Sequence, residues 1–154
     1  MSNYKQFKIY ADTSVFGGLF DEEFSAHSKL FFQTAHDKKF KLVTSAVVSK
    51  EIETAPQEVT HFFKKILRIC EIADITDEAL ALQASYVKQD IVTPKYYDDA
   101  LHVAIATVWG CDCIVSWNFK HIVNYHKIPL YNAVNALNGY DNIAIYSPQE
   151  VIYE

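Results

Sequence analysis

The sequence predicts an α/β fold, a three-layer α/β/α sandwich in which helices cover both faces of a central parallel sheet. Short β-rich runs alternate with helical segments, an order typical of parallel strands joined by crossover helices. A length of 154 residues matches one domain, and a chain that is 50% hydrophobic and 21% charged has a globular composition. We therefore expect a single domain over residues 1–154, without repeats.

Five short runs rich in β-branched and aromatic residues predict the strands. The first run, FKIYA, ends immediately before Asp12, and the fourth, CIVS, ends immediately before Trp117. The predicted strands are residues 7–11, 41–44, 70–75, 113–116 and 143–146. The connections between them are long enough to hold helices, so we expect the strands to run parallel.

The predicted helices are recognised by apolar residues at helical spacing and by residues typical of helix ends. Ser45 is placed to cap the helix after the second strand, and Pro56 ends that helix and begins the next. Gly110 and Gly139 end two later helices. Apart from the helices at Ser45 and Pro56, the predicted helices are residues 25–36, 76–89, 94–109 and 129–138.

Composition and charge exclude several classes of protein. No apolar stretch approaches the roughly 20 residues that cross a bilayer, and the first residues lack the pattern of a signal peptide, so we expect a cytoplasmic protein without a membrane partner. Cys70, Cys111 and Cys113 form no C-x-x-C pair and are expected to be buried thiols. The net charge of −5 does not exclude nucleic acid, because basic clusters exist. They are Lys38, Lys39 and Lys41; Lys64, Lys65 and Arg68; and Lys120, His121 and Lys127.

Polar side chains gather at the edge where open parallel sheets bind their ligands. Asp12 comes directly after the first strand, and Ser116 and Asn118 lie at the end of the fourth. Asp98 and Asp99 open the helix before that strand, where the positive helix end favours carboxylates. Taken alone, Asp12 is more typical of a turn or cap. The combination of these residues predicts a site.

One glutamate on the helix after the second strand is predicted to face the core. The apolar arc of this helix is formed by Val47, Val48 and Ile52. At about 100° per residue, Glu51 falls inside that arc, whereas Glu53 lies opposite and points to solvent. An unpaired buried carboxylate is costly, so Glu51 needs a cation. A metal ion would serve, and an ion pair with Lys or Arg is the alternative.

The helix from Pro94 is apolar on most sides, and its polar residues gather on one face. Asp98, Asp99 and His102 lie there at i, i+3 and i+4 spacing. Periodicity does not choose between the two aspartates. His102 is either a metal ligand or a hydrogen-bonded packing histidine, and the second is more common.

Four motifs contain these residues, and their order and spacing are informative. They are Asp12 with Thr13 and Ser14, Glu51 six positions after Ser45, D-A-L-H-V-A-I-A from Asp99, and S-W-N-F-K-H-I from Ser116. Together they resemble the PIN domain, most closely the prokaryotic branch that includes the VapC-type toxins. The likeness extends over nearly the whole chain, including N-A-V-N from Asn132 and the closing S-P-Q-E-V-I.

The resemblance implies a parallel-sheet sandwich that cleaves RNA with Mg²⁺ or Mn²⁺. By matching position, Asp12, Glu51 and Asp99 correspond to acids of the family's site, so we expect them to be catalytic metal ligands. Asp98 has no such counterpart. Asn118 stands where many members carry a fourth acid, and as a neutral ligand it puts a second metal ion in doubt. We expect four further residues around these ligands, where they would orient the ligands or contact the substrate. They are Ser14, Ser116, Asp98 and His102.

The resemblance implies RNA as a partner and leaves open a cognate antitoxin protein and a homodimer. Two other functions also stay open. A PIN-like module without catalysis would bind RNA or protein, and Asn118 favours it. A phosphatase would use Asp12 as its nucleophile, although Ser14 stands where haloacid-dehalogenase-like enzymes carry a general-acid aspartate. Aromatic side chains near the predicted site are candidates to stack on RNA bases. The nearest are Tyr96, Tyr97 and Trp117.

Overall fold

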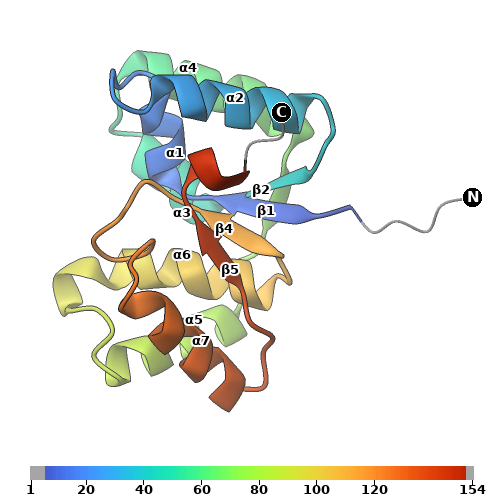
Figure 1. Cartoon of the computed structure of the whole chain (residues 1–154). Coiled ribbons are helices and arrows are strands. Elements are labelled where there is room, and N and C mark those ends of the chain that lie inside the picture. The colour runs from blue at the N-terminus through green and yellow to red at the C-terminus, as the bar shows by residue number, and fades with distance from the viewer. Residues whose placement is uncertain (1–5, 152–154) are drawn as a thin grey trace, which may run out of the picture.

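The fold is a five-stranded parallel sheet between two layers of helices, in a computed structural model that describes residues 6–151 (Figure 1). The strand order is β3-β2-β1-β4-β5, and every neighbouring pair is parallel. The strands are β1 (Lys8–Ala11), β2 (Lys41–Ser45), β3 (Glu71–Ala73), β4 (Cys113–Val115) and β5 (Ala144–Tyr146). The predicted α/β class and its three layers are confirmed.

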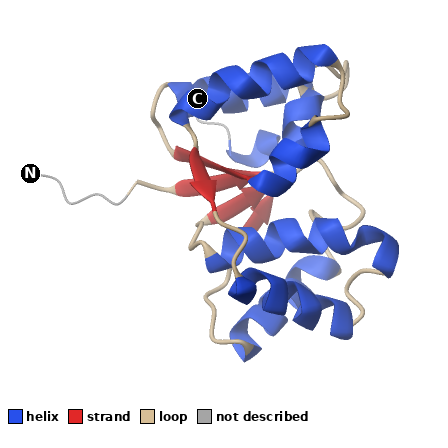
Figure 2. Ribbon diagram, turned by 180° about the vertical axis from the view of Figure 1, so that it is seen from behind, coloured by secondary structure: helices blue, strands red, loops and turns tan. Residues whose placement is uncertain are grey.

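Helices cover both faces of the sheet, as Figures 1 and 2 show. One layer contains α1, α2 and α4, the other contains α5, α6 and α7, and α3 directly follows β2. The helices are α1 (Thr13–Gly18), α2 (Ser25–His36), α3 (Ala46–Ile52), α4 (Gln57–Ile66), α5 (Asp77–Lys88), α6 (Tyr97–Val108) and α7 (Lys127–Leu137), with short 3₁₀ turns η1 (Leu67–Ile69), η2 (Pro94–Tyr96) and η3 (Pro148–Val151). Within residues 6–151, none has the length and apolar character needed to cross a membrane.

The strand order reverses at β1, which brings two segments of the chain together at one edge of the sheet. The chain leaves β1 toward the layer of α1 and leaves β4 toward the layer of α7 (Figure 1). The register pairs Ala11 with Val115, and the Asp12 N–H donates to the Val115 carbonyl at 3.2 Å. Asp12 and Ser116 therefore leave the sheet side by side, at the kind of crevice where open α/β sheets bind ligands.

The core is formed by the sheet and by the inner sides of both helix layers, and α6 is the most buried helix. Every residue from 100 to 107 is buried, because α6 packs between the sheet and α5. The small and aliphatic side chains of this helix allow that close packing. The first turns of α6 carry Asp99 and His102, so both residues start from a rigid element.

Several elements differ from those predicted. Helix α1 was not predicted, because six residues ending in two glycines are too short to give a clear periodic pattern. Ser45 occupies the N-cap position of α3, but its hydroxyl bonds to Tyr10 and not to the helix backbone. Pro94 begins a 3₁₀ turn, so α6 starts only at Tyr97. The third strand is shorter than residues 70–75, since only three of them pair with β2.

Candidate active site

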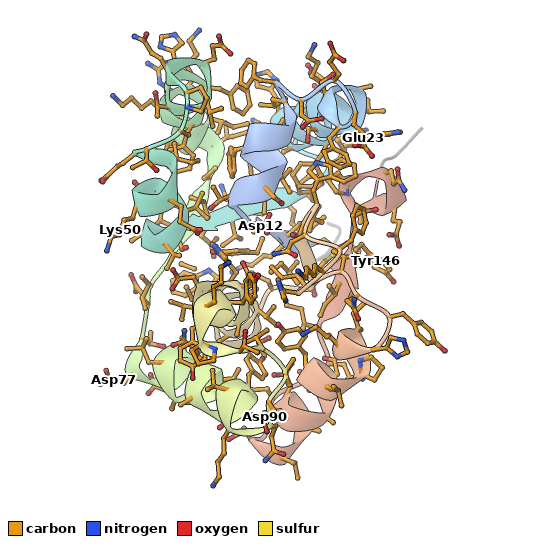
Figure 3. All side chains as sticks on the ribbon, turned by 90° about the vertical axis from the view of Figure 1, so that its left-hand side faces the viewer. Asp12, Glu23, Lys50, Asp77, Asp90 and Tyr146 are labelled. Atoms are coloured by element: carbon orange, nitrogen blue, oxygen red, sulfur yellow. The ribbon has the colours of Figure 1, made fainter. Side chains whose placement is uncertain are left out.

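Asp12 lies at the carboxyl end of β1, beside the end of β4, and near the centre of the view onto this edge of the sheet (Figure 3). Its side chain is buried, and its Oδ1 and Oδ2 atoms accept hydrogen bonds from Ser14 Oγ and Ser116 Oγ, each at 2.6 Å. Burial raises the pKa of Asp12, and Glu51 adds to this effect, whereas His102 and the two hydroxyls oppose it. The carboxylate is thus held in one orientation with its charge incompletely balanced.

Two serine hydroxyls tie Asp12 to the segment that follows β4. Ser14 Oγ donates to Asp12 and accepts from the Trp117 N–H at 2.8 Å. Ser116 Oγ donates to Asp12 and accepts from the Asn118 N–H at 2.8 Å. Because each hydroxyl proton is directed at the carboxylate and each oxygen receives a backbone N–H, both side chains are fixed.

Glu51 points from α3 toward α6 and contacts His102. Its Oε1 atom lies 2.5 Å from His102 Nε2 and accepts from the Thr13 hydroxyl at 3.0 Å. Burial would raise the pKa of Glu51, but the hydrogen bond and charge of His102 outweigh burial, so the pKa is lowered. Glu53 is exposed and lines a hollow beside Lys50. Both glutamates are exposed, so the prediction that Glu51 is turned into the core is only partly right. Glu51 does reach a buried partner, but this is a histidine, where the sequence left open a metal ion or an ion pair with Lys or Arg.

His102 is buried, and both of its ring nitrogens have partners. Its Nδ1 atom lies 2.7 Å from the Tyr10 hydroxyl, which in turn lies 2.7 Å from Ser45 Oγ. Burial lowers the pKa of His102, but the hydrogen bond to Glu51 and the surrounding carboxylates outweigh burial, so the pKa is raised. The contacts are those of a hydrogen-bonded histidine that balances the charge of the acids.

The two aspartates at the start of α6 lie in different surroundings. Asp98 is exposed, whereas Asp99 is half-buried. Burial raises the pKa of Asp99, and the Asn118 amide and two nearby histidines oppose this shift without cancelling it. Asp99 therefore faces the other polar residues of the crevice, and Asp98 does not share this environment.

Asn118 organises the loop that follows β4. Its Oδ1 atom accepts from the His121 N–H at 2.9 Å, and its backbone carbonyl accepts from the N–H groups of Ile122 and Val123. The side-chain amide lies near the Asp99 carboxylate and lowers the pKa of that group. These contacts favour a role in positioning the loop and Asp99 over the expected role of metal ligand.

The three predicted acids reach the same edge of the sheet without forming a ready set of metal ligands. Asp12 and Asp99 each lie close enough to Glu51 for its charge to raise their pKa values. Within the part of the chain that the structure describes, no three His, Cys, Asp or Glu side chains converge on one point as metal ligands would, and Glu51 is turned to His102. Incompletely balanced carboxylates still suit Mg²⁺ or Mn²⁺, which prefer oxygen ligands.

Two of the aromatic residues nearest the site are already stacked. The Trp117 ring is buried, lies 4.2 Å from the Phe24 ring between centroids, and donates from Nε1 to Ser28. In this conformation the ring is part of the core and does not offer a free face to a base. Tyr96 stacks on His121 with ring centroids 3.7 Å apart, so only one of its faces is free.

Three side chains of this region were not among the predicted site residues, namely Tyr10, Ser45 and His121. Tyr10 could have been found, because it precedes Asp12 by two positions in an extended segment, and such residues share a face. The partners of Ser45 and His121 come from distant segments, which periodicity does not reveal. Both His121 ring nitrogens are buried without a hydrogen-bond partner among the described residues.

The cysteines form no part of this site. Cys70, Cys111 and Cys113 are free thiols, half-buried in the first case and buried in the other two. Burial raises the pKa of each thiol to about 12, so all three stay protonated at neutral pH. This agrees with the expectation of unreactive thiols.

Comparison with known proteins identifies the fold. No family model and no curated protein matches the chain. Among solved structures, VapBC2 from Rickettsia felis bound to a promoter DNA fragment is similar, with 13% identity, a TM-score of 0.62, and coverage of 92% of this chain and 98% of that chain. FitAcB from Neisseria gonorrhoeae gives 12% identity, a TM-score of 0.59, and coverage of 93% and 99%.

A third similar structure is VapC20 from Mycobacterium tuberculosis, described as a toxin that cleaves the sarcin-ricin loop. It is 13% identical, with a TM-score of 0.52 and coverage of 88% of this chain and 98% of that chain. Identities this low establish the fold and not the chemistry. The predicted resemblance is therefore confirmed at the level of the fold, which is that of the VapC-type PIN domains.

Proposed function

We propose that this chain is a metal-dependent ribonuclease that hydrolyses RNA phosphodiester bonds. The observation that carries this proposal is the buried Asp12 carboxylate, held by two serine hydroxyls at the reversal point of the sheet. Glu51 lies near enough to raise the pKa of Asp12, and it does the same to Asp99. VapC20, which shares the fold, is described as cleaving the sarcin-ricin loop, and this supports RNA as the substrate. The corresponding biological role is the toxin of a toxin–antitoxin pair.

Mg²⁺ or Mn²⁺ is the proposed cofactor, and Asp12, Glu51 and Asp99 are the residues that would hold it. When bound, such an ion lowers the pKa of a water molecule and stabilises the negative charge that develops on the phosphate. Asp12 and Asp99 are the principal ligands, because burial raises both of their pKa values. Asn118 is a weaker candidate, since its carbonyl oxygen already accepts from His121.

The neighbouring side chains prepare the carboxylates for this role. Ser14 and Ser116 hold Asp12 in one orientation, so little side-chain freedom remains to be lost on binding. His102 keeps Glu51 ionised, which suits a residue that orients a water molecule through a hydrogen bond. Asp98 is exposed and is therefore proposed to face the substrate and not the metal.

A cognate antitoxin is the proposed protein partner. The similarity to VapBC2 and FitAcB supports a second protein of this kind. A homodimer is a separate proposal, and light scattering of the purified chain tests it. A molar mass close to the 17.6 kDa of one chain at every concentration would exclude the homodimer.

A PIN-like module without catalysis is the second candidate, and the Glu51–His102 contact favours it. A histidine already neutralises one of the three acids, and Asn118 stands where a fourth would add charge. Calorimetric titration separates the candidates. The ribonuclease requires Mn²⁺ to bind the parent at least tenfold more tightly than it binds Asp12→Asn, by roughly 1.4 kcal/mol, whereas an inactive module binds Mn²⁺ equally weakly in both forms.

Product chemistry tests the reaction itself. The purified chain with Mn²⁺ should cleave RNA into fragments that carry a 5′-phosphate and a 3′-hydroxyl, and EDTA should stop it. A phosphatase with Asp12 as its nucleophile would form an acid-stable aspartyl product. The two hydrogen bonds to the buried Asp12 carboxylate favour a fixed ligand over such a nucleophile.

A further inference from the structure

A cationic and aromatic cluster adjoins the acid site. Tyr96 of η2 stacks on His121 of the loop after β4, with ring centroids 3.7 Å apart and the ring planes inclined by 28°. The Nζ atoms of Lys95 and Lys120 lie 5.6 Å and 5.8 Å from the centroid of the Tyr96 ring. Two ammonium groups from distant parts of the sequence are thus held at one ring, where the π face attracts cations.

The positive charge of this cluster is not balanced within the described residues. The ion pairs there are Lys8–Glu71, His36–Asp37 and His102–Glu51, so neither Lys95 nor Lys120 takes part in one. Both lysines are exposed. They repel each other, in a chain whose net charge is −5 and which offers many carboxylates. An anion from outside the chain would relieve this repulsion.

His121 forms the buried base of the cluster, beneath the exposed lysines. Its side chain is only 8% exposed, and neither ring nitrogen has a hydrogen-bond partner among residues 6–151. A neutral imidazole carries one donor and one acceptor, and leaving both unmet is costly. Lys127, another cation near this ring, donates instead to the Ile91 carbonyl at 2.5 Å.

The cluster lies directly beside the candidate metal ligands. Tyr96 precedes Asp99 by three residues at the start of α6, and Asn118 contacts the His121 backbone from the other side. Burial lowers the pKa of His121, while the nearby charge of Asp99 opposes this shift and that of Lys120 adds to it. Asp99 and Lys120 therefore both lie near His121.

We propose that Lys95 and Lys120, with the Tyr96–His121 stack behind them, bind a phosphate of the RNA chain next to the phosphate that is cleaved. We call this the Lys95/Lys120 subsite, and it rests on the proposed ribonuclease function. Lysine ammonium groups bind phosphate as point charges. One face of the Tyr96 ring is covered by His121. The two ammonium groups would contact the phosphate backbone, which carries no sequence information.

The Lys95/Lys120 subsite would offset the repulsion between RNA and the acids. A cluster of carboxylates repels a polyanion when no metal is bound, and two unpaired cations on its rim act in the opposite direction. Because phosphate contacts are independent of sequence, the subsite should strengthen the binding of any single-stranded RNA to a similar degree.

The test compares two double variants that lose the same charge. Lys95→Gln with Lys120→Gln removes the subsite, and Lys29→Gln with Lys88→Gln removes two exposed lysines, from α2 and α5, that belong to none of the basic clusters. Anisotropy in EDTA measures the binding of a labelled single-stranded RNA octamer as a function of salt. The subsite variant should bind about tenfold more weakly than the control, from two ion pairs of ordinary strength. Its salt slope should fall by about 0.7 for each phosphate that the protein no longer neutralises.

Further measurements separate the remaining explanations. Lys95→Arg with Lys120→Arg keeps both charges and should bind the octamer like the parent, which excludes misfolding as the cause of weaker binding. Equal affinities and slopes for the two Gln double variants would overturn the subsite. If inorganic phosphate competes as well as the octamer does, the site takes a small anion and the assignment to RNA is wrong.

Failure of the proposed function gives a different result. If the parent cleaves no RNA in Mn²⁺ but the subsite variant still binds RNA selectively more weakly, the ribonuclease proposal fails and the Lys95/Lys120 subsite stands. If the parent cleaves RNA and both Gln double variants bind RNA equally well, only the subsite fails.

Discussion

The Nε2 atom of His102 lies 2.5 Å from Oε1 of Glu51, so α6 and α3 are joined at the carboxyl edge of the sheet. The contact raises the pKa of His102 against the effect of burial and lowers that of Glu51. The contact therefore favours the charged form of each group, and the histidine provides charge balance that a metal ion would otherwise supply to Glu51.

Replacing Glu51 should destabilise the metal-free protein. Glu51→Gln leaves the buried His102 without its carboxylate, and we expect a loss of about 1 to 2 kcal/mol in the free energy of unfolding, reduced by the partial exposure of Glu51 to solvent. Glu53→Gln, adjacent to the same helix but exposed, should change stability by less than about 0.5 kcal/mol. Urea unfolding in EDTA at pH 6 measures both. Equal stabilities would mean that the contact contributes nothing.

The stabilisation by this pair should depend on pH in a defined direction. The pKa of His102 is raised, so its contribution is complete below the ordinary value of 6.5 and is lost as the pH rises through the folded value. The pKa of Glu51 is lowered, so its contribution is present above 4.5 and is lost as the pH falls through the folded value. The stability difference between parent and Glu51→Gln should thus be largest between pH 4.5 and 6.5. A difference that is constant with pH would contradict the ion pair.

The sequence predicted most of the fold because the periodic elements agree with one another. The five strands were found from β-rich runs, and Asp12 was placed at a strand end from its position alone. Helix α1 was missed, because its six residues include Gly17 and Gly18 and give no periodic pattern. The predicted strands are too long where one or two residues at their ends have no neighbouring strand to pair with, as in residues 70–75.

The candidate site was only partly predictable for a different physical reason. The helical arc places Glu51 on the inner side of α3, but no local pattern indicates that His102 would reach it from another helix. Ser45 was expected to cap α3, because that is the usual role of such a serine, and the Tyr10 hydroxyl is its partner instead. Choosing Asp99 over Asp98 required the family resemblance, since both lie in the first turn of α6.

Removing the charge of Asp99 should stabilise the metal-free protein. Burial raises the pKa of Asp99, so its ionisation at neutral pH opposes folding. We expect Asp99→Asn to gain about 1 kcal/mol in EDTA at pH 7.5, and the gain to shrink as falling pH protonates the parent. Asp98→Asn is the control and should have little effect. Thermal melts in EDTA and in Mn²⁺ measure the stability of the parent and the variants. If Mn²⁺ stabilises the parent and Asp99→Asn equally, Asp99 has a structural role at the start of the helix and does not bind the metal.

Gly18 is required by the packing of α1 against the segment after β4. A Cβ atom there would lie 2.7 Å from Trp117 Nε1 and 2.8 Å from Ser28 Oγ, two atoms joined by a hydrogen bond. Gly18→Ala should therefore cost about 1 to 3 kcal/mol of stability. At Gly17 an added Cβ meets nothing within 4 Å, so Gly17→Ala should stabilise the helix by about 0.4 to 1 kcal/mol. In urea unfolding, the two substitutions should change the free energy of unfolding in opposite directions. A Gly18→Ala protein as stable as the parent would show that the Trp117 ring is free to move.

Ser116 should affect metal binding through Asp12. Ser116→Ala removes the donor to Asp12 Oδ2 and should weaken Mn²⁺ binding by about 10- to 100-fold, the usual effect of losing a group that orients a metal ligand. Ser85→Ala is the control, because the half-buried Ser85 hydroxyl on α5 donates to the Ala81 carbonyl of its own helix. Titration calorimetry with Mn²⁺ provides the measurement. Unchanged affinity in Ser116→Ala would mean that its hydroxyl does not orient the carboxylate for a metal.

The acids at the reversal point of the sheet are proposed to hold a metal ion with which the protein cleaves RNA. The most direct measurement is RNA cleavage in Mn²⁺ by the parent, by Asp99→Asn and by Asp98→Asn, two variants that lose one charge from adjacent positions. We predict cleavage by the parent and by Asp98→Asn, and none by Asp99→Asn or by any form in EDTA. Undiminished cleavage by folded Asp99→Asn protein would contradict the proposal that Asp99 holds the metal ion required for RNA cleavage.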